Sequence, residues 1–188
     1  VLPHVTSANH PVLLRGRHGI GKSSVVYQYA TSVGLPVVER RASQMTEGDL
    51  LGLPKVDDDV TSFCPPDWFA AACNNGVLLF LDEVDRATLE VRQGIFELCD
   101  SRKLAGHVLH PDTLIFAAVN GGTHAGAAAY QVGEMDPAEL DRYTVFDVEP
   151  SIDDWITWAQ TNCDPLVTDF IRNHTEHLEH NDDPEPNK

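Results

Sequence analysis

Residues 16–23 constrain the fold and the chemistry of this chain more than any other stretch. They read Gly-Arg-His-Gly-Ile-Gly-Lys-Ser and match the pattern G-x-x-x-x-G-K-S of a phosphate-binding loop. The apolar residues 11–14 directly before the loop predict a buried strand, and the apolar spacing over residues 22–32 predicts a helix directly after it. Strand, glycine-rich loop and helix in this order are the context that the motif requires, which disfavours a chance match.

The loop also predicts how a phosphate would be held. Its glycines let the backbone bend tightly and come close to a ligand, so that successive N–H groups surround an anion at the start of the helix. Lys22 can reach the outer phosphates of a nucleotide, and the hydroxyl of Ser23 can ligate Mg²⁺. The residues that we expect to contact the nucleotide are Gly16, His18, Gly19, Ile20, Gly21, Lys22, Ser23 and Ser24.

Predicted strands and helices alternate along most of the chain. Further strands are predicted at residues 35–41, 77–81, 114–119 and 143–148, and further helices at 68–73, 87–100, 136–142, 152–160 and 164–178. Shorter features are a helical turn at 47–51, a loop or small hairpin at 55–66, a hairpin at 107–113 around residues 111–112, and a mobile loop at 121–134. The alternation predicts an α/β fold in which a five-stranded sheet carries helices on both faces.

Three polar residues directly follow two of the apolar strands, at the carboxyl ends where ligands bind in such sheets. Asp82 can hold Mg²⁺ opposite Ser23, and Glu83 can polarise a water molecule for attack on the γ-phosphate. Asn120 can hydrogen-bond the γ-phosphate or the attacking water. Two plainer interpretations stay open: the acids can serve a helix N-terminus, and Asn120 can be an ordinary turn residue.

Arg142 closes the predicted helix 136–142, just before the last strand. A positive side chain there could complete the site of a neighbouring subunit and stabilise charge in the transition state, as arginine fingers do. The alternative is a surface ion pair with Asp141 or Glu139, and position alone favours that alternative.

Composition narrows the classes of function. A chain of 188 residues fits one domain, and its formal net charge of −16 disfavours broad contact with nucleic acid, which requires phosphate neutralisation. No apolar run approaches the ~20 residues that span a membrane, and the first residues lack the pattern of a signal peptide. The four cysteines form no C-x-x-C pair, which disfavours a zinc ribbon or a redox motif. We expect them to be reduced thiols of a cytoplasmic protein.

Several stretches together resemble the family of AAA+ ATPases. They are Gly16 to Ser23, Val77 to Glu83, Leu114 to Asn120 and Glu139 to Tyr143. The sequence Asp-Glu-Val-Asp-Arg-Ala at residues 82–87, followed by Glu-Val-Arg-Gln at 90–93, is similar to the MoxR-like branch of that family. Residues 49–54 and 154–159 are similar to MoxR-like proteins of phages and bacteria, and the whole resemblance covers roughly residues 11–160.

The resemblance implies a fold, an activity and roles for single residues. The fold is a P-loop NTPase three-layer sandwich with five parallel strands in the order 5-1-4-3-2, and the activity is Mg²⁺-dependent hydrolysis of ATP. The implied roles are Walker A for Lys22 and Ser23, Walker B for Asp82 and Glu83, sensor 1 for Asn120 and arginine finger for Arg142.

The resemblance also implies partners. Proteins of this kind usually act as rings, often hexamers, that remodel a client protein. Many of them work with a partner that carries a von Willebrand A domain. Loops near residues 55–66 would then face the pore of the ring or its client.

The chain departs from the family pattern in two places. Arg17 and His18 stand where the phosphate loop usually has proline, and the only arginine after Arg142 is Arg172, which matches no lid motif. We therefore expect residues 1–150 to form the AAA+ core, residues 151–180 a partial helical lid and residues 181–188 a disordered acidic tail. The partial lid leaves an alternative function, a nucleotide-dependent binding or scaffold module with little or no hydrolysis.

Overall fold

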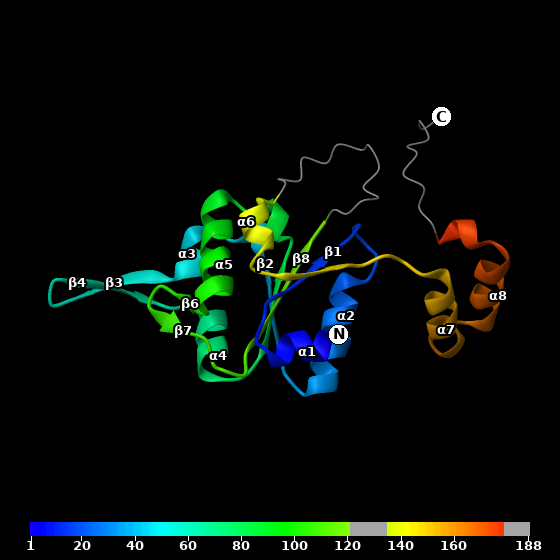
Figure 1. The fold of residues 1–188 in the computed structure, drawn as a ribbon, viewed down its shortest axis with the longest axis horizontal. Coiled ribbons are helices and arrows are strands. Elements are labelled where there is room, and N and C mark those ends of the chain that lie inside the picture. Colours follow the sequence, from blue (N-terminus) through cyan, green and yellow to red (C-terminus); the bar gives the residue numbers. More distant parts are fainter. Residues whose placement is uncertain (121–134, 179–188) are drawn as a thin grey trace, which may run out of the picture.

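The structure is a computed structural model that describes residues 1–120 and 135–178 (Figure 1). The predicted mobile loop 121–134 and the predicted disordered tail 181–188 lie outside the described residues. Within the described residues, the chain forms a central parallel sheet with helices on both faces, as the alternation of predicted strands and helices indicates.

The central sheet has five strands in the order β2-β5-β8-β1-β9, and every neighbouring pair is parallel. These strands are β1 (Val12–Arg15), β2 (Val37–Arg41), β5 (Leu78–Asp82), β8 (Leu114–Val119) and β9 (Thr144–Asp147). Numbered by their place in the chain, they run 5-1-4-3-2 across the sheet, so the predicted order is confirmed. The parallel arrangement brings the carboxyl ends of β1, β5 and β8 to one edge of the sheet, where the predicted site residues lie.

Side chains of the central strands alternate between two apolar layers, which explains why these strands read as continuous apolar runs. In β1, Leu13 belongs to the cluster on one face, and Val12 and Leu14 belong to the cluster on the other. Residues 78–81 of β5 are divided in the same way, and all of them are fully buried. Helices α3 (Glu47–Leu51), α4 (Asp67–Asn74) and α5 (Leu89–Ser101) cover the first face. Helices α1 (Leu2–Ser7) and α2 (Lys22–Val33) cover the second, so the predicted three-layer sandwich is confirmed.

Several helices begin after a residue whose side chain caps them. Thr46 accepts a hydrogen bond from the first turn of α3, Thr88 from that of α5 and Asp136 from that of α6. The helices are α1 (Leu2–Ser7), α2 (Lys22–Val33), α3 (Glu47–Leu51), α4 (Asp67–Asn74), α5 (Leu89–Ser101), α6 (Pro137–Leu140), α7 (Ile152–Asn162) and α8 (Pro165–Asn173), and the 3₁₀ turns are η1 (Ala42–Gln44), η2 (Val84–Arg86) and η3 (Thr175–His177). None of the described helices is both long and apolar enough to cross a membrane.

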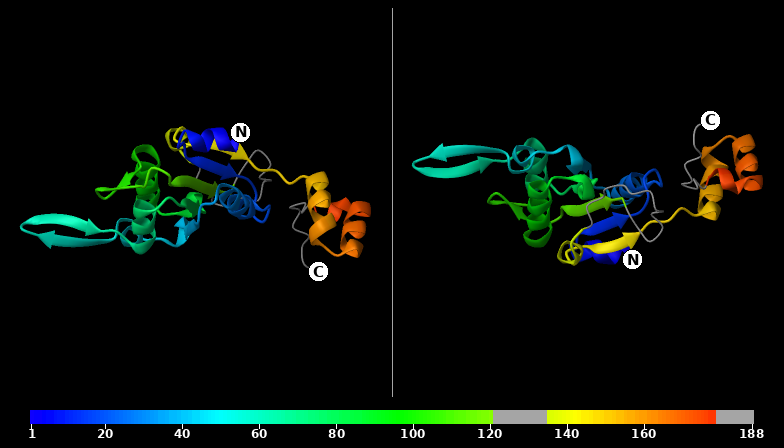
Figure 2. Two further views of the ribbon diagram at one scale, coloured as in Figure 1. Left: turned by 90° about the horizontal axis from the view of Figure 1, so that it is seen from below. Right: turned by 90° about the horizontal axis from the view of Figure 1, so that it is seen from above.

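A long hairpin extends away from the core at one end of the molecule (Figures 1 and 2). It consists of β3 (Leu53–Asp57) and β4 (Val60–Cys64), so the segment predicted to be a loop or small hairpin is a hairpin. Asp58 and Asp59 form its turn, with φ of 45° and 62°. Apart from Phe63, which is half-buried, its strand residues are exposed.

The hairpin predicted around residues 111–112 is wrong. The pairing strands are β6 (Lys103–Leu104) and β7 (His107–Val108), and their turn is Ala105-Gly106, with φ of 48° and 86°. Residues 110–113 form only a tight turn, in which the N–H of Thr113 donates to the carbonyl oxygen of His110 at 3.0 Å. The glycine, which adopts positive φ without strain, decides where the chain reverses.

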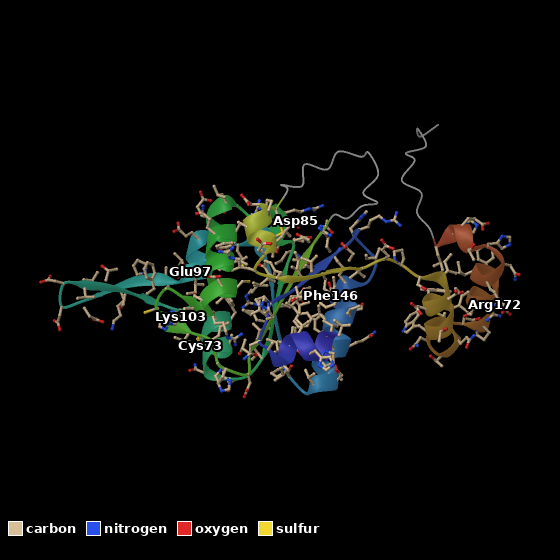
Figure 3. The ribbon with its side chains drawn as sticks, in the orientation of Figure 1. Cys73, Asp85, Glu97, Lys103, Phe146 and Arg172 are labelled. Atoms are coloured by element: carbon tan, nitrogen blue, oxygen red, sulfur yellow. The ribbon has the colours of Figure 1, made fainter. Side chains whose placement is uncertain are left out.

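The last helix is shorter than the predicted range 164–178. Helix α8 ends at Asn173, whose side-chain amide donates to the carbonyl oxygen of Asp169 and thereby competes with the helical backbone bonds. His174 then leaves the helical conformation at φ −139° and ψ 63°. Helices α7 and α8 pack against each other at the end of the molecule opposite to the long hairpin, where Figure 3 labels Arg172.

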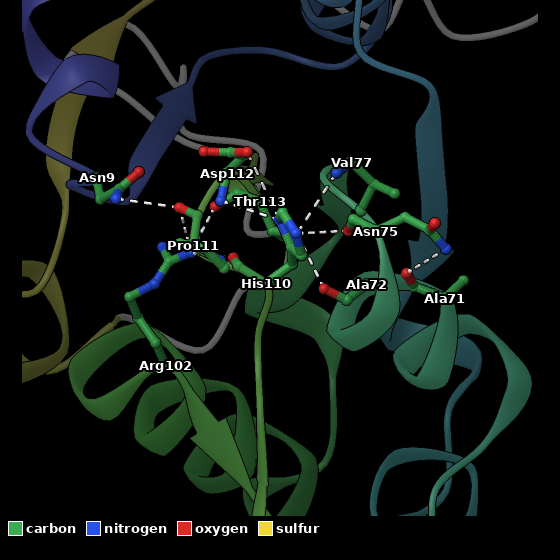
Figure 4. Close-up of polar contacts among 10 residues, drawn as sticks. All are labelled: Asn9, Ala71, Ala72, Asn75, Val77, Arg102, His110, Pro111, Asp112 and Thr113. Atoms are coloured by element: carbon green, nitrogen blue, oxygen red, sulfur yellow. Dashed lines mark hydrogen bonds and ion pairs between the residues drawn. The ribbon is translucent and has the colours of Figure 1, made fainter.

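A hydrogen-bond network ties the amino ends of β5 and β8 to α4 and α5 (Figure 4). Thr113 is fully buried. Its hydroxyl donates to two carbonyl oxygens, that of Ala72 at 2.9 Å and that of Asn75 at 3.1 Å. Arg102, which directly follows α5, donates to the carbonyl oxygens of His110 and Thr113. The network holds the edge of the sheet that lies opposite to the carboxyl ends of its strands.

Replacing Thr113 with valine keeps the shape of the side chain and removes its hydroxyl. We expect Thr113→Val to lower the free energy of unfolding by about 1–3 kcal/mol, the cost of leaving buried polar groups unpaired. Urea denaturation followed by circular dichroism measures this change. Thr61→Val, at an exposed position of β4, is the matched control and should change the same quantity by less than about 0.5 kcal/mol. Equal changes in the two variants would contradict the role given to the network.

Candidate nucleotide-binding site

The glycine-rich loop runs from the end of β1 to the first residue of α2, as predicted. Gly19 and Gly21 have φ of 76° and 95°, in the left-handed region that favours glycine. Gly21 directly precedes α2, so the unpaired N–H groups of the first helical turn continue the line of loop amides. A backbone of this kind suits an anion.

Gly16 stands at the most crowded point of the loop. A Cβ atom there would lie 2.5 Å from the carbonyl oxygen of Val148 and 2.5 Å from Cδ1 of Ile20. The N–H of Gly16 donates to the carbonyl oxygen of Val119, the last residue of β8, at 3.4 Å. Glycine at this position therefore lets the loop begin between the ends of β8 and β9.

Lys22 is the first residue of α2 and is only 8% exposed. Its ammonium donates to the carbonyl oxygens of Gly16 and Arg17, each at 2.8 Å, and to Oδ1 of Asn120 at 3.1 Å. Burial lowers the pKa of this ammonium, and the charges of Asp82 and Asp85 oppose that shift. Through these contacts Lys22 joins the loop to the end of β8.

Asp82 and Glu83 stand at the end of β5 and have different partners. Burial raises the pKa of the Asp82 carboxyl, and the N–H of Glu83, which donates to its Oδ1 at 2.9 Å, opposes that shift. Glu83 has a φ of 55°, which is uncommon for a residue other than glycine. Its carboxylate accepts a hydrogen bond from the hydroxyl of Ser43 in η1. Nothing in the sequence around Ser43 predicts this contact.

Asp85 is a site residue for which the sequence alone predicts no role, although it lies within residues 82–87, the stretch that is similar to MoxR-like proteins. It is 4% exposed, and its Oδ2 accepts a hydrogen bond from the N–H of Asn120 at 3.2 Å. Burial raises the pKa of its carboxyl, and the bond from Asn120 opposes that shift. Among the described residues, its second oxygen, Oδ1, has no hydrogen-bond partner. Figure 3 labels Asp85 at the edge of the sheet near α6.

Four of the predicted site residues come together at this edge of the sheet: Lys22, Asp82, Glu83 and Asn120. Lys22 is hydrogen-bonded to Asn120, and the charges of Asp82 and Glu83 both act on its ammonium. Lys22 and the acid pair therefore share one site, as the proposed chemistry requires.

The remaining loop residues that were predicted to contact nucleotide flank Lys22. Ser23 and Ser24 follow it in the first turn of α2, where Ser23 is half-buried and Ser24 is exposed. His18 is exposed, whereas Ile20 is half-buried and lies against Gly16.

Arg142 has its described contacts on α5 and α6 instead of with Lys22. Its guanidinium lies 4.3 Å from the ring centroid of Phe96 and pairs with Asp100 at 3.4 Å. The ion pair predicted as the alternative is therefore made with α5 and not with a neighbour on its own helix, and Glu139 pairs with Arg92 instead. Both pairs attach α6 to α5.

The residues at the site fit a complex of Mg²⁺ and nucleotide. Backbone amides at the start of α2 and the ammonium of Lys22 suit phosphate oxygens, and the Ser23 hydroxyl and the Asp82 carboxylate are oxygen ligands of the kind that Mg²⁺ takes. Within residues 1–120 and 135–178, no three His, Cys, Asp or Glu side chains form a group that could hold a metal ion. A magnesium ion here would therefore take part of its coordination from phosphate and water.

The strand order and the loop geometry define the class of protein, a P-loop NTPase. The model of the AAA domain family, dynein-related subfamily, matches residues 11–143, well over half of the chain. The chain belongs to this family. The resemblance to AAA+ ATPases is thereby confirmed, and the chain is a P-loop ATPase domain.

Two relatives are similar to this chain over more than half of its length. It is 32% identical over 120 residues to the protein CbbQ of Hydrogenophilus thermoluteolus. This match covers 60% of this chain and 45% of CbbQ. It is also 33% identical over 122 residues to midasin of Giardia intestinalis. That match covers 58% of this chain and 2% of midasin. CbbQ is a MoxR-like AAA+ protein, which agrees with the MoxR-like resemblance. The matched region thus spans less than half of either relative.

A solved structure has the same fold. A RuvB mutant of Thermotoga maritima superposes with a TM-score of 0.53 and 14% identity, over 83% of this chain and 45% of that chain. At this identity the likeness bears on the fold alone, and it agrees with the α/β P-loop architecture.

The crowding at Gly16 gives a prediction about stability. We expect Gly16→Ala to lower the free energy of unfolding by about 1–3 kcal/mol, because a Cβ atom would overpack the junction of the loop with β9. Gly48→Ala is the matched control, since a Cβ atom there meets nothing closer than Oγ1 of Thr46 at 3.8 Å. The control should be neutral or stabilising by up to about 1 kcal/mol, as alanine is preferred to glycine in helices. Urea denaturation measures both, and a Gly16→Ala variant as stable as the control would refute the close approach.

Proposed function

We propose that this chain binds ATP together with Mg²⁺, hydrolyses it, and uses the hydrolysis to remodel a partner protein as a subunit of a ring. The observation that carries the proposal is the convergence of the Lys22 ammonium, the acid pair Asp82-Glu83 and Asn120 at the start of α2. Membership of the AAA family supports ATP as the nucleotide.

Each residue of the site has a part in the proposed reaction. The loop amides and Lys22 bind the outer phosphates, and Ser23 and Asp82 hold Mg²⁺, which when bound neutralises charge on the phosphates. Glu83 orients a water molecule and accepts its proton. Asn120 hydrogen-bonds the γ-phosphate or that water, because its side chain already lies within bonding distance of Lys22.

The ring is the part of the proposal that concerns Arg142. We place this residue as the arginine finger of a neighbouring subunit, because its described contacts lie on α5, on the flank of the sheet away from α2 (Figure 1). A hexamer is the assembly that we propose, with α7 and α8 as part of its lid. The exposed β3–β4 hairpin would contact the client protein or a partner that carries a von Willebrand A domain.

One observation favours a second candidate function, a module that binds nucleotide with little or no hydrolysis. The carboxylate of Glu83 accepts a hydrogen bond from Ser43, which occupies one of the acceptor sites that would otherwise be open to water. Calorimetry of Mg-ATP binding combined with phosphate release at several protein concentrations separates the two functions. Tight binding without phosphate release at any concentration would favour the second.

Two substitutions test the proposed hydrolysis. We expect Lys22→Ala and Glu83→Gln each to lower ATP turnover by about 100-fold or more, which is what positioned acid–base groups and phosphate contacts contribute. Lys22→Ala should also weaken the binding of ATP, whereas Glu83→Gln should retain it. Phosphate release measures turnover, and calorimetry measures binding. Asp112→Ala, on the opposite edge of the sheet, is the control; full turnover in both site variants would show that these roles are wrong.

A mixing experiment tests the proposed place of Arg142. Arg142→Ala and Glu83→Gln should each be inactive alone, because each lacks one part of the composite site. Mixed in equal amounts, the two variants should regain turnover, since an Arg142→Ala subunit keeps Glu83 and can receive Arg142 from its neighbour. Mass measurement in solution with ATP shows whether mixed rings form. If mixed rings form and remain inactive, Arg142 does not act across subunits.

A further inference from the structure

Every proton of the Lys22 ammonium is already used inside the protein. A lysine ammonium has three donors and no acceptor. Here they go to the carbonyl oxygens of Gly16 and Arg17 and to Oδ1 of Asn120, at 2.8, 2.8 and 3.1 Å. Lys22 can therefore donate to a phosphate oxygen only if one of these hydrogen bonds is given up.

Asn120 is the acceptor that can be given up most readily. The other two acceptors are backbone oxygens of the loop, which can turn away from the ammonium only if the loop moves. Asn120 lies 98 residues along the chain from Lys22, at the end of β8, and its bond is the longest of the three. A rotation of its side chain is enough to release the ammonium.

Asp85 holds Asn120 in the position from which it reaches Lys22. Its Oδ2 accepts the hydrogen bond from the N–H of Asn120 at 3.2 Å, and the residue is 4% exposed in η2. Asn120 thus has its backbone fixed by Asp85 and its side chain on Lys22. The two contacts form a chain from a buried carboxylate through one residue to the ammonium.

We propose that Asn120, positioned by Asp85, holds Lys22 in competition with phosphate, so that this pair of residues sets the affinity of the nucleotide site. The inference rests on the proposed nucleotide binding and adds regulation of affinity to it. It differs in sign from a simple contact role: removal of a residue that only contacts nucleotide weakens binding, whereas removal of a competitor strengthens it.

The test is the dissociation constant of Mg-ADP, measured by calorimetry on the full chain. ADP lacks the γ-phosphate that Asn120 is proposed to contact, so the measurement isolates the competition for Lys22. We expect Asn120→Ala to bind Mg-ADP about tenfold more tightly, the low end for a hydrogen bond to a charged group. Asp85→Ala should also tighten binding, and the control Asp112→Ala should leave it unchanged. Unchanged or weaker binding by Asn120→Ala overturns the competition.

A conservative variant separates position from charge. Asp85→Asn removes the charge of Asp85 and keeps an oxygen that can accept from the N–H of Asn120. We expect its affinity to stay within about twofold of the unsubstituted chain, because the acceptor and not the charge positions Asn120. If Asp85→Asn tightens binding as much as Asp85→Ala, the effect is repulsion between a carboxylate and phosphate, and the positioning role is overturned.

A readout without nucleotide completes the test. Hydrogen exchange of the backbone N–H of Asn120, followed by NMR, should become faster in Asp85→Ala and stay slow in Asp85→Asn and Asp112→Ala. Equal exchange in all of these variants would show that Asp85 does not fix Asn120. If no variant binds Mg-ADP, the proposed nucleotide binding fails, whereas binding that Asn120→Ala does not tighten refutes only the competition.

Discussion

A nearly buried ammonium, that of Lys22, is the interaction on which the site depends. Burying a cation is costly unless it is paired and hydrogen-bonded. Here the loop supplies two carbonyl oxygens, β8 supplies the amide oxygen of Asn120, and β5 with η2 supplies the nearby charges of Asp82 and Asp85. Separate elements thus act on one atom, Nζ of Lys22, and each must be correctly placed for the buried ammonium to be stable.

The strand order is what makes this meeting possible. In the sheet β8 lies between β1 and β5. Asn120, which follows β8, therefore lies between Lys22, which follows the loop after β1, and the acids that follow β5. Asn120 consequently reaches Lys22 with its side chain and Asp85 with its backbone. At the opposite edge, Thr113 and Arg102 tie the same strands to α4 and α5. Stability and chemistry thus occupy different ends of the same strands.

Much of the fold could be predicted from the sequence because its signals are local. Apolar runs predicted the five strands, and the loop motif with its flanking strand and helix predicted the phosphate site. Strand order came from the family resemblance and agrees with the structure. Sequence alone could not predict contacts that depend on tertiary approach. Ser43 donates a hydrogen bond to Glu83, which lies 40 residues further along the chain. Arg142 forms its ion pair with Asp100 and not with acids closer in the chain.

Asp85 shows the same limit from another side. In the sequence Asp85 looks like any acidic residue of an exposed surface. The packing of η2 against the end of β8 makes it a buried partner of Asn120. The misplaced hairpin near residues 103–108 has a related cause. Proline and aspartate at 111–112 also favour a turn, but the pairing of β6 with β7 places the reversal at Ala105-Gly106, where the glycine adopts a positive φ without strain.

The β3–β4 hairpin carries a consequence for solubility. It is a ribbon of two strands whose outer edges have no further strand beside them in the described structure, and such edges are templates on which other copies of a chain can add. Leu53, Val56 and Val60 are exposed along it, which would favour that addition. Consecutive carboxylates at 57–59 lie at its tip, where Asp57 pairs with Lys55 at 2.6 Å, and charged side chains on an exposed ribbon oppose such addition.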